Sequence, residues 1–108
     1  MQQIDLTQKA EINLYYDLWV PDELADAAPL LIAVHGYGAH KRYMLREARL
    51  VAPDNFVIAS IQAPHPHFRS TPDGYRVGYG WLSDQKSEEY VRLHHKFVLD
   101  VIAKLASD

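Results

Sequence analysis

The chain has 108 residues, a formal net charge of −3 and no cysteine. A chain of this length buries roughly two-thirds of its unfolded surface, so we expect one domain over residues 1–108. Hydrophobic residues make up 48% and charged residues 23% of the sequence, which is typical of a soluble globular protein. The acidic balance argues against nucleic-acid binding, and the lack of cysteine excludes disulfides, thiolate metal sites and a cysteine nucleophile.

The first residues, Met1 to Asp5, contain neither the basic region nor the apolar run of a secretory signal. The longest apolar stretch, residues 29–34, is too short to span a bilayer. We therefore expect a soluble, cytoplasmic protein with no membrane span.

The first half of the chain contains three segments with the pattern of strands and one with the pattern of a helix. Residues 4–20 are rich in β-forming residues and alternate loosely, which predicts two short strands with a turn near residues 7–10. Residues 30–34 and 56–61 are continuous apolar runs, typical of strands buried on both faces. Between these runs, apolar residues recur at helical spacing over residues 40–52.

The second half of the chain begins with residues 65–85, which contain two prolines, three glycines and four aromatic residues. We interpret this stretch as a long irregular loop, and loops of that length usually have a function. A helix follows, with Ser87 as its cap and an end at Ala106. Its predicted buried stripe consists of Tyr90, Leu93, Phe97, Val98, Val101, Ile102 and Leu105. The order of elements predicts an α/β fold with a mixed sheet, in which antiparallel first strands are followed by parallel strands.

The most informative motif is Leu-Ile-Ala-Val-His-Gly-Tyr-Gly at residues 31–38, which leads directly into the first predicted helix. A buried strand there brings backbone N–H groups to its carboxyl end, beside a helix N-terminus. The two glycines allow a sharp turn and the close approach of a ligand. Such N–H groups can bind an anion or a developing oxyanion.

With this motif, the sequence resembles the amino-terminal half of an α/β-hydrolase, closest to the carboxylesterase/phospholipase group of serine esterases. Besides the motif, the resemblance covers the preceding antiparallel strands, the strand 56–61 with Gln62-Ala63-Pro64, and residues 80–84 before the last helix. It extends over residues 10–108. It implies a partial α/β-hydrolase fold, ester hydrolysis through an acyl-enzyme, a small ester substrate and no cofactor.

The resemblance also implies roles for particular residues. The backbone N–H of Tyr37 would be one donor of the oxyanion hole, because the family draws one such N–H from the loop after its third strand. The implied substrate-binding residues are Gly36, Tyr37, Gly38 and Trp81.

The family's nucleophile is a serine within Gly-x-Ser-x-Gly, and no such motif occurs in this sequence. Only Gly74 and Gly78 have the required spacing, and the residue midway between them is Arg76. In the family, the serine, acid and histidine all follow the helix that ends here at Ala106. We therefore expect the chain to supply the oxyanion loop without a catalytic triad, and to be inactive alone.

Other serines do not supply the missing nucleophile. Two sets of residues occur in triad order, Ser60 with Asp73 and His94, and Ser70 with Asp84 and His95, but such orders arise by chance. Ser60 lies inside an apolar strand and lacks the turn and helix that expose a catalytic hydroxyl. We interpret Ser60 as a strand hydroxyl that is bonded to the backbone.

The histidines and aromatic residues also have structural interpretations. His65 and His67 could offer two metal ligands, but no third histidine or paired carboxylate lies near them in sequence. We therefore predict no metal site. His94 and His95 point about 100° apart on a helix, so one should touch the sheet and the other solvent. The aromatic residues have two open interpretations, an acyl or alcohol pocket and packing of the loop onto the sheet: Phe68, Tyr75, Tyr79 and Trp81.

Two alternatives come from other functional classes. The pattern Gly36-x-Gly38-x-x-Lys41 is similar to a nucleotide-binding loop, but it lacks the third glycine of the dinucleotide fingerprint and the Lys-Ser/Thr pair of a P-loop. The second alternative is a non-catalytic half-fold that acts as a binding or assembly module. In the family the sheet continues beside strand 30–34, so this edge would be open here. It would recruit a second copy, giving a homo-oligomer, or a complementary carboxyl-terminal polypeptide.

Overall fold

The computed structural model describes residues 1–82 and 87–107. In chain order, its elements are β1 (Tyr16–Trp19), β2 (Leu30–Val34), α1 (Lys41–Val51), β3 (Val57–Ile61), β4 (His65–Thr71), β5 (Gly74–Gly80) and α2 (Ser87–Ser107). These described residues therefore form two helices, a three-stranded mixed sheet and a two-stranded hairpin. The predicted mixed α/β class is confirmed.

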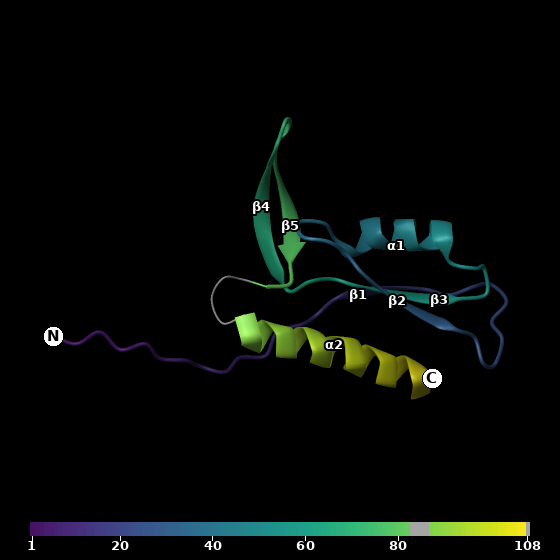
Figure 1. Cartoon of the computed structure of the whole chain (residues 1–108), viewed down its shortest axis with the longest axis horizontal. Helices are drawn as coiled ribbons and strands as arrows, with labels where there is room; N and C mark the ends of the chain where they lie inside the picture. Colours follow the sequence, from purple (N-terminus) through teal and green to yellow (C-terminus); the bar gives the residue numbers. More distant parts are fainter. Residues whose placement is uncertain (83–86, 108) are drawn as a thin grey trace.

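The three-stranded sheet has the order β1-β3-β2, with β3 in the centre. Strand β1 runs antiparallel to β3, and β2 runs parallel to β3, with Leu30 opposite Val57 and Val34 opposite Ile61. The helices α1 and α2 cover opposite faces of this sheet (Figure 1). Because β3 is enclosed by strands on both edges and helices on both faces, its residues 58–61 are at most 1% exposed.

Each helix buries an apolar stripe against one face of the sheet. On one face, Ala48 of α1 packs with Ala33 and Ile58, and on the other, Phe97 and Val101 of α2 pack with residues of β3. Both helices were predicted to within about two residues, the usual uncertainty at helix ends. The side chain of Ser87, the predicted cap, lies outside the described residues. Neither described helix combines the length and the apolarity needed to cross a membrane.

The prediction of two strands within residues 4–20 was wrong, since only Tyr16–Trp19 form a strand. Residues 1–12 extend away from the body of the protein (Figure 1), whereas Leu14 packs against the core beside α2. The side chains of Ile4, Leu6 and Ile12 are 65–81% exposed. A β-like pattern forms a strand only where a partner offers backbone hydrogen bonds, and within the described residues only the segment beside β3 has one.

The prediction of a long irregular loop was also wrong for residues 65–80, which form the antiparallel β4–β5 hairpin. Residues 71–74, Thr-Pro-Asp-Gly, make the turn, in which Gly74 has a φ of +123° and Thr71 Oγ1 donates to the Gly74 carbonyl at 2.9 Å. Pro-Asp-Gly is a turn signal with a physical basis, because proline presets φ and glycine accepts a positive φ. Of the remaining predicted loop and family segment, Ser83 and Asp84 lie outside the described residues.

Candidate functional site

His35 fixes the carboxyl ends of β2 and β3 to each other. Its Nε2 accepts a hydrogen bond from the Ala63 N–H at 3.0 Å, and its Nδ1 lies 2.8 Å from the Gly36 carbonyl oxygen. Since Nε2 accepts, the proton belongs on Nδ1, which donates to Gly36. The side chain is only 3% exposed. Burial lowers the pKa of His35 below its usual value, with a smaller contribution from His40, while the Gly36 carbonyl opposes the shift.

Trp81 connects the carboxyl end of β2 with α2. Its indole N–H donates to the His35 carbonyl at 2.9 Å, and its ring lies 5.2 Å from the His35 ring and 4.3 Å from the His94 ring. Trp81 also packs against the buried cluster that includes Phe97. These contacts agree with the packing interpretation, whereas Phe68 and Tyr75 are more than three-quarters exposed and serve neither predicted role among the described residues. A role of Trp81 in substrate binding stays a prediction.

The predicted oxyanion loop forms a tight turn over residues 36–39. The Ala39 N–H donates to the Gly36 carbonyl at 3.1 Å, and Gly38, the third residue of the turn, has a φ of 78°. A positive φ at this position is typical of a type II turn and favours glycine. The Tyr37 N–H donates to no acceptor among the residues that the structure describes. Its ring is 79% exposed and stacks on His67 at 4.9 Å.

The turn is held against β5 by backbone hydrogen bonds. The Gly38 N–H donates to the Tyr79 carbonyl at 2.9 Å, and the Tyr79 N–H donates to the Ala39 carbonyl at 3.1 Å. Arg69 Nη1 donates to the Gly38 carbonyl at 3.0 Å. A Cβ atom at Gly78 would lie 2.4 Å from the Gly38 oxygen, so this close approach requires glycine. The hairpin and the turn therefore form one unit.

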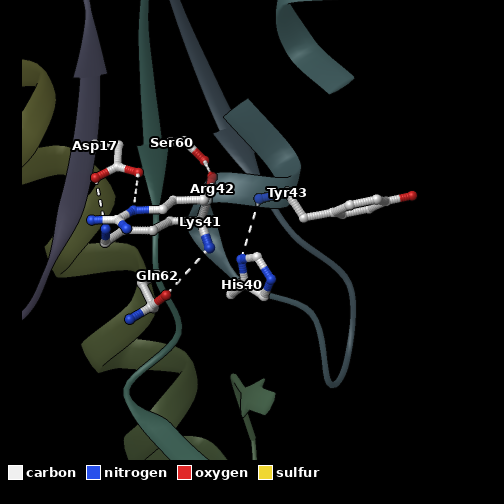
Figure 2. Close-up of polar contacts among 7 residues, drawn as sticks. All are labelled: Asp17, His40, Lys41, Arg42, Tyr43, Ser60 and Gln62. Atoms are coloured by element: carbon white, nitrogen blue, oxygen red, sulfur yellow. Dashed lines mark hydrogen bonds and ion pairs between the residues drawn. The ribbon is translucent and has the colours of Figure 1, made fainter. Parts of the chain in front are cut away.

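The N-terminus of α1 is already capped (Figure 2). Gln62 Oε1 accepts from the Lys41 N–H at 3.2 Å, and His40 Nδ1 accepts from the Tyr43 N–H at 3.2 Å. These two helix donors are thus unavailable to a ligand. The Tyr37 N–H, which precedes the helix, has no acceptor among the described residues.

Ser60 and Asp17 anchor the first turn of α1 from the sheet (Figure 2). Ser60 Oγ donates to the Lys41 carbonyl at 2.6 Å, and Lys41 Nζ forms an ion pair with Asp17 at 2.6 Å. Ser60 is fully buried, which confirms its interpretation as a strand hydroxyl bonded to the backbone. Asp73 lies at the exposed hairpin turn, so the structure does not assemble Ser60 and Asp73 into a triad. Asp84 of the second set lies outside the described residues.

The remaining histidines pack against aromatic rings. The His65 ring lies 4.3 Å from the Tyr90 ring, and His94 lies against Trp81. Burial lowers the pKa of His94, with a further contribution from His95, which is exposed. As expected, one side chain of the His94–His95 pair is packed and the other is solvated. The packed side chain, His94, contacts Trp81, which follows β5, and not a strand of the sheet. Within residues 1–82 and 87–107, no three His, Cys, Asp or Glu side chains are placed to hold a metal ion.

A pocket of about 430 Å³ lies beside this site, between residues 13–15, the segment 62–64 after β3, and Tyr79. Lys41 and Pro66 also line this pocket. None of the four predicted substrate-binding residues lines it, so the pocket and the turn are neighbouring features at the same end of the sheet.

The sequence motif located the turn but missed the residues that hold it. Arg69, Gly78 and Tyr79 come from the hairpin, whose Pro-Asp-Gly turn was the available signal. Comparisons of the chain with protein-family models, with curated proteins and with solved structures found no match. The functional argument therefore depends on the motif and the geometry of the site.

Proposed function

We propose that the chain is the oxyanion-loop part of a serine ester hydrolase of the α/β-hydrolase type, closest to the carboxylesterase/phospholipase group. The observation that carries this proposal is the turn at residues 36–39, at the carboxyl end of a parallel strand, with the Tyr37 N–H lacking an acceptor among the described residues. The substrate would be a small ester in contact with Gly36, Gly38 and Trp81. A cytoplasmic location and independence of a cofactor remain part of the proposal.

The arrangement of the strands supports this assignment. The resemblance implies antiparallel strands before parallel ones and a sheet that continues beside residues 30–34. The described residues contain antiparallel β1, parallel β2 and β3, helices on both faces, and an outer edge of β2 that pairs with no described strand. These features agree with an α/β-hydrolase sheet up to the strand before the nucleophile.

In the proposed reaction, the Tyr37 N–H donates to the ester carbonyl oxygen as negative charge develops there. The donor is preorganised, because Gly36 is held by His35 and Ala39, and Gly38 is held by Tyr79. A preorganised donor stabilises the oxyanion without rearrangement in the transition state, and one such donor contributes about 100- to 1,000-fold to the rate. His35 is not the base, since both of its ring nitrogens are engaged and the ring is buried.

The nucleophile, base and acid of this reaction would come from residues outside the sequence. A fluorophosphonate, which labels activated serines, tests this through the intact mass of the protein isolated from its own cells. We expect the adduct on a heavier species containing this sequence, or on a second polypeptide bound to it. The isolated 108-residue chain should stay unlabelled at 12.4 kDa and should not hydrolyse a p-nitrophenyl ester.

The Ser60→Ala variant is the matched control for this experiment. We expect it to behave like the unaltered chain, because Ser60 is fully buried and bonded to the Lys41 carbonyl. If the isolated chain hydrolyses the ester and Ser60→Ala abolishes this turnover, the proposal that the chain lacks the nucleophile is contradicted. Recovery from cells of only an unlabelled 12.4 kDa species would contradict the hydrolase proposal.

A second candidate function, an assembly module, is favoured by the outer edge of β2. This edge belongs to an apolar strand, pairs with no described strand, and ends at Val34, which is 46% exposed. Unpaired N–H and C=O groups on such an edge recruit another strand. The partner would be a second copy of the chain or a complementary carboxyl-terminal polypeptide.

Light scattering coupled to size-exclusion chromatography tests this candidate on the isolated chain. We expect a mass of at least twice 12.4 kDa, and a shift toward monomer in Val34→Lys, because charge on an edge strand discourages pairing. Leu50→Lys, at an exposed position of α1, is the matched control and should leave the mass unchanged. A monomer with a cooperative melt would contradict self-assembly.

A further inference from the structure

A second, smaller pocket lies beside the turn at residues 36–39, on the side of the hairpin. It has a volume of about 270 Å³ and is formed between β4, β5 and the first residues of α1. Its charged lining residues are Arg69 and Arg76 from the hairpin, and its other titratable lining residues are His40 and Tyr43 at the start of α1. Within the described lining there is no acidic residue, so the pocket is basic although the chain as a whole carries a net charge of −3.

The hairpin places the two arginines directly opposite each other. Arg69 pairs with Arg76 in the register of β4 and β5, so both side chains lie on one face of the ribbon. Like charges in directly opposed positions destabilise a strand pair. Arg76 has an exposed ion pair with Asp73 at 3.9 Å, a contact that contributes little. Arg69 has no carboxylate partner in residues 1–82 and 87–107. A bound anion would neutralise this pair.

The guanidinium of Arg69, an exposed residue, contacts the turn through one hydrogen bond. Its Nη1 donates to the Gly38 carbonyl, and its Cδ and Nε atoms lie against the place that a Cβ of Gly38 would occupy. The bond to Gly38 uses one of the five N–H groups of a guanidinium. The fork of the remaining donors matches the two oxygens of a carboxylate or a phosphate.

We propose that this pocket binds an oxyanion group of the substrate, a carboxylate or a phosphate, with Arg69 as its principal donor and Arg76 as its second. That the anion is part of an ester rests on the function proposed above. Gly38 lines the pocket and directly follows Tyr37, so the charged group would lie next to the reacting carbonyl. The substrate class is then an ester with an anionic group close to its scissile bond.

Nuclear magnetic resonance titrations of the 108-residue chain test the pocket without any catalytic step. The probes are inorganic phosphate and acetate, added at constant ionic strength because salt screens exposed charges. We expect saturable shifts at the Arg69 Nε–H and at the amides of Gly38 and Ala39. Since a charge-assisted hydrogen bond contributes about 1.5–3 kcal/mol, Arg69→Gln should weaken binding of the anion by roughly tenfold or more.

Three further variants make the result specific. Arg76→Gln should weaken binding less than Arg69→Gln, and it leaves the contact with Gly38 intact, so it tests the pocket even if Arg69→Gln disturbs the turn. Arg69→Lys keeps the charge but loses the fork, and should give an intermediate affinity. Arg92→Gln, on α2, removes the same charge elsewhere and should change the affinity by less than about twofold, as expected for a screened exposed charge.

Shifts with phosphate alone would assign a phosphate-bearing ester, and shifts with both probes would extend the class to carboxylates. Absence of saturable binding of either probe, or equal effects of Arg92→Gln and the two pocket variants, would overturn the proposal. Because the titration needs no nucleophile, its failure would leave the fluorophosphonate result untouched. Conversely, if the chain binds the anion but no fluorophosphonate labels the protein, the anion-binding pocket is supported and the proposal that its ligand is an ester is contradicted.

Discussion

Replacing Gly78 with alanine is expected to separate the β4–β5 hairpin from the turn at residues 36–39. The added Cβ would lie 2.4 Å from the Gly38 carbonyl oxygen and 2.7 Å from Cδ of Arg69. Arg69 is flexible and can move, but the Gly38 oxygen is backbone and is fixed by the turn. The hydrogen bonds between Gly38, Ala39 and Tyr79 would have to lengthen or break.

The expected loss of stability for Gly78→Ala is about 3 kcal/mol, at the upper end of the usual cost of overpacking. Urea denaturation measures it, and hydrogen exchange at the amides of Gly38 and Tyr79 shows whether the damage is at this contact. Gly36→Ala is the matched control. A Cβ there meets no atom within 4 Å, so its effect should stay within about 0.5 kcal/mol. Equal stability of the two variants would show that the close approach is unimportant.

The elements that were predicted correctly are those whose pattern is local. Strand β2, helix α1 and strand β3 follow from two apolar runs and one helical repeat, and their burial follows from the same residues. The β4–β5 hairpin was missed because its prolines and glycines were counted as loop composition. Their positions carried the information, since Pro72-Asp73-Gly74 marks a turn between two segments that pair residue by residue.

The candidate site was predictable only as far as its motif. Tyr37 and Gly38 follow from the order of strand, glycine turn and helix, because that order determines where backbone N–H groups collect. The bonds from Ala63 to His35 and from Arg69 to Gly38 join residues 28 and 31 positions apart. No local pattern encodes such contacts, since they depend on the parallel register of β2 with β3 and on where the hairpin docks.

His35 makes the stability of the protein depend on pH. Its pKa in the folded state is below the usual value of 6.5, chiefly because the ring is buried. The unfolded chain therefore binds the proton first as the pH falls, so the free energy of unfolding decreases below about pH 6.5. The contribution of His35 is complete above its unfolded pKa and is lost as the pH falls toward its folded pKa. The lowered pKa of His94 acts in the same direction.

Protonation of His35 has a structural consequence beyond the loss of free energy. A protonated Nε2 can no longer accept from the Ala63 N–H, so the link between the ends of β2 and β3 is lost, whereas Nδ1 still donates to the Gly36 carbonyl. Urea denaturation between about pH 7.5 and 5.5 should show the free energy of unfolding falling as the pH falls, with a slope from this group of at most about 1.4 kcal/mol per pH unit. His35→Gln should be less stable at neutral pH but have a shallower dependence, because glutamine does not titrate. His95→Gln, at an exposed position, should keep the His35 contribution to the slope and lose only the smaller part that His95 adds through the pKa of His94. Stability that rises on acidification, or an unchanged slope in His35→Gln, would show that His35 does not link the ends of β2 and β3 as a neutral acceptor.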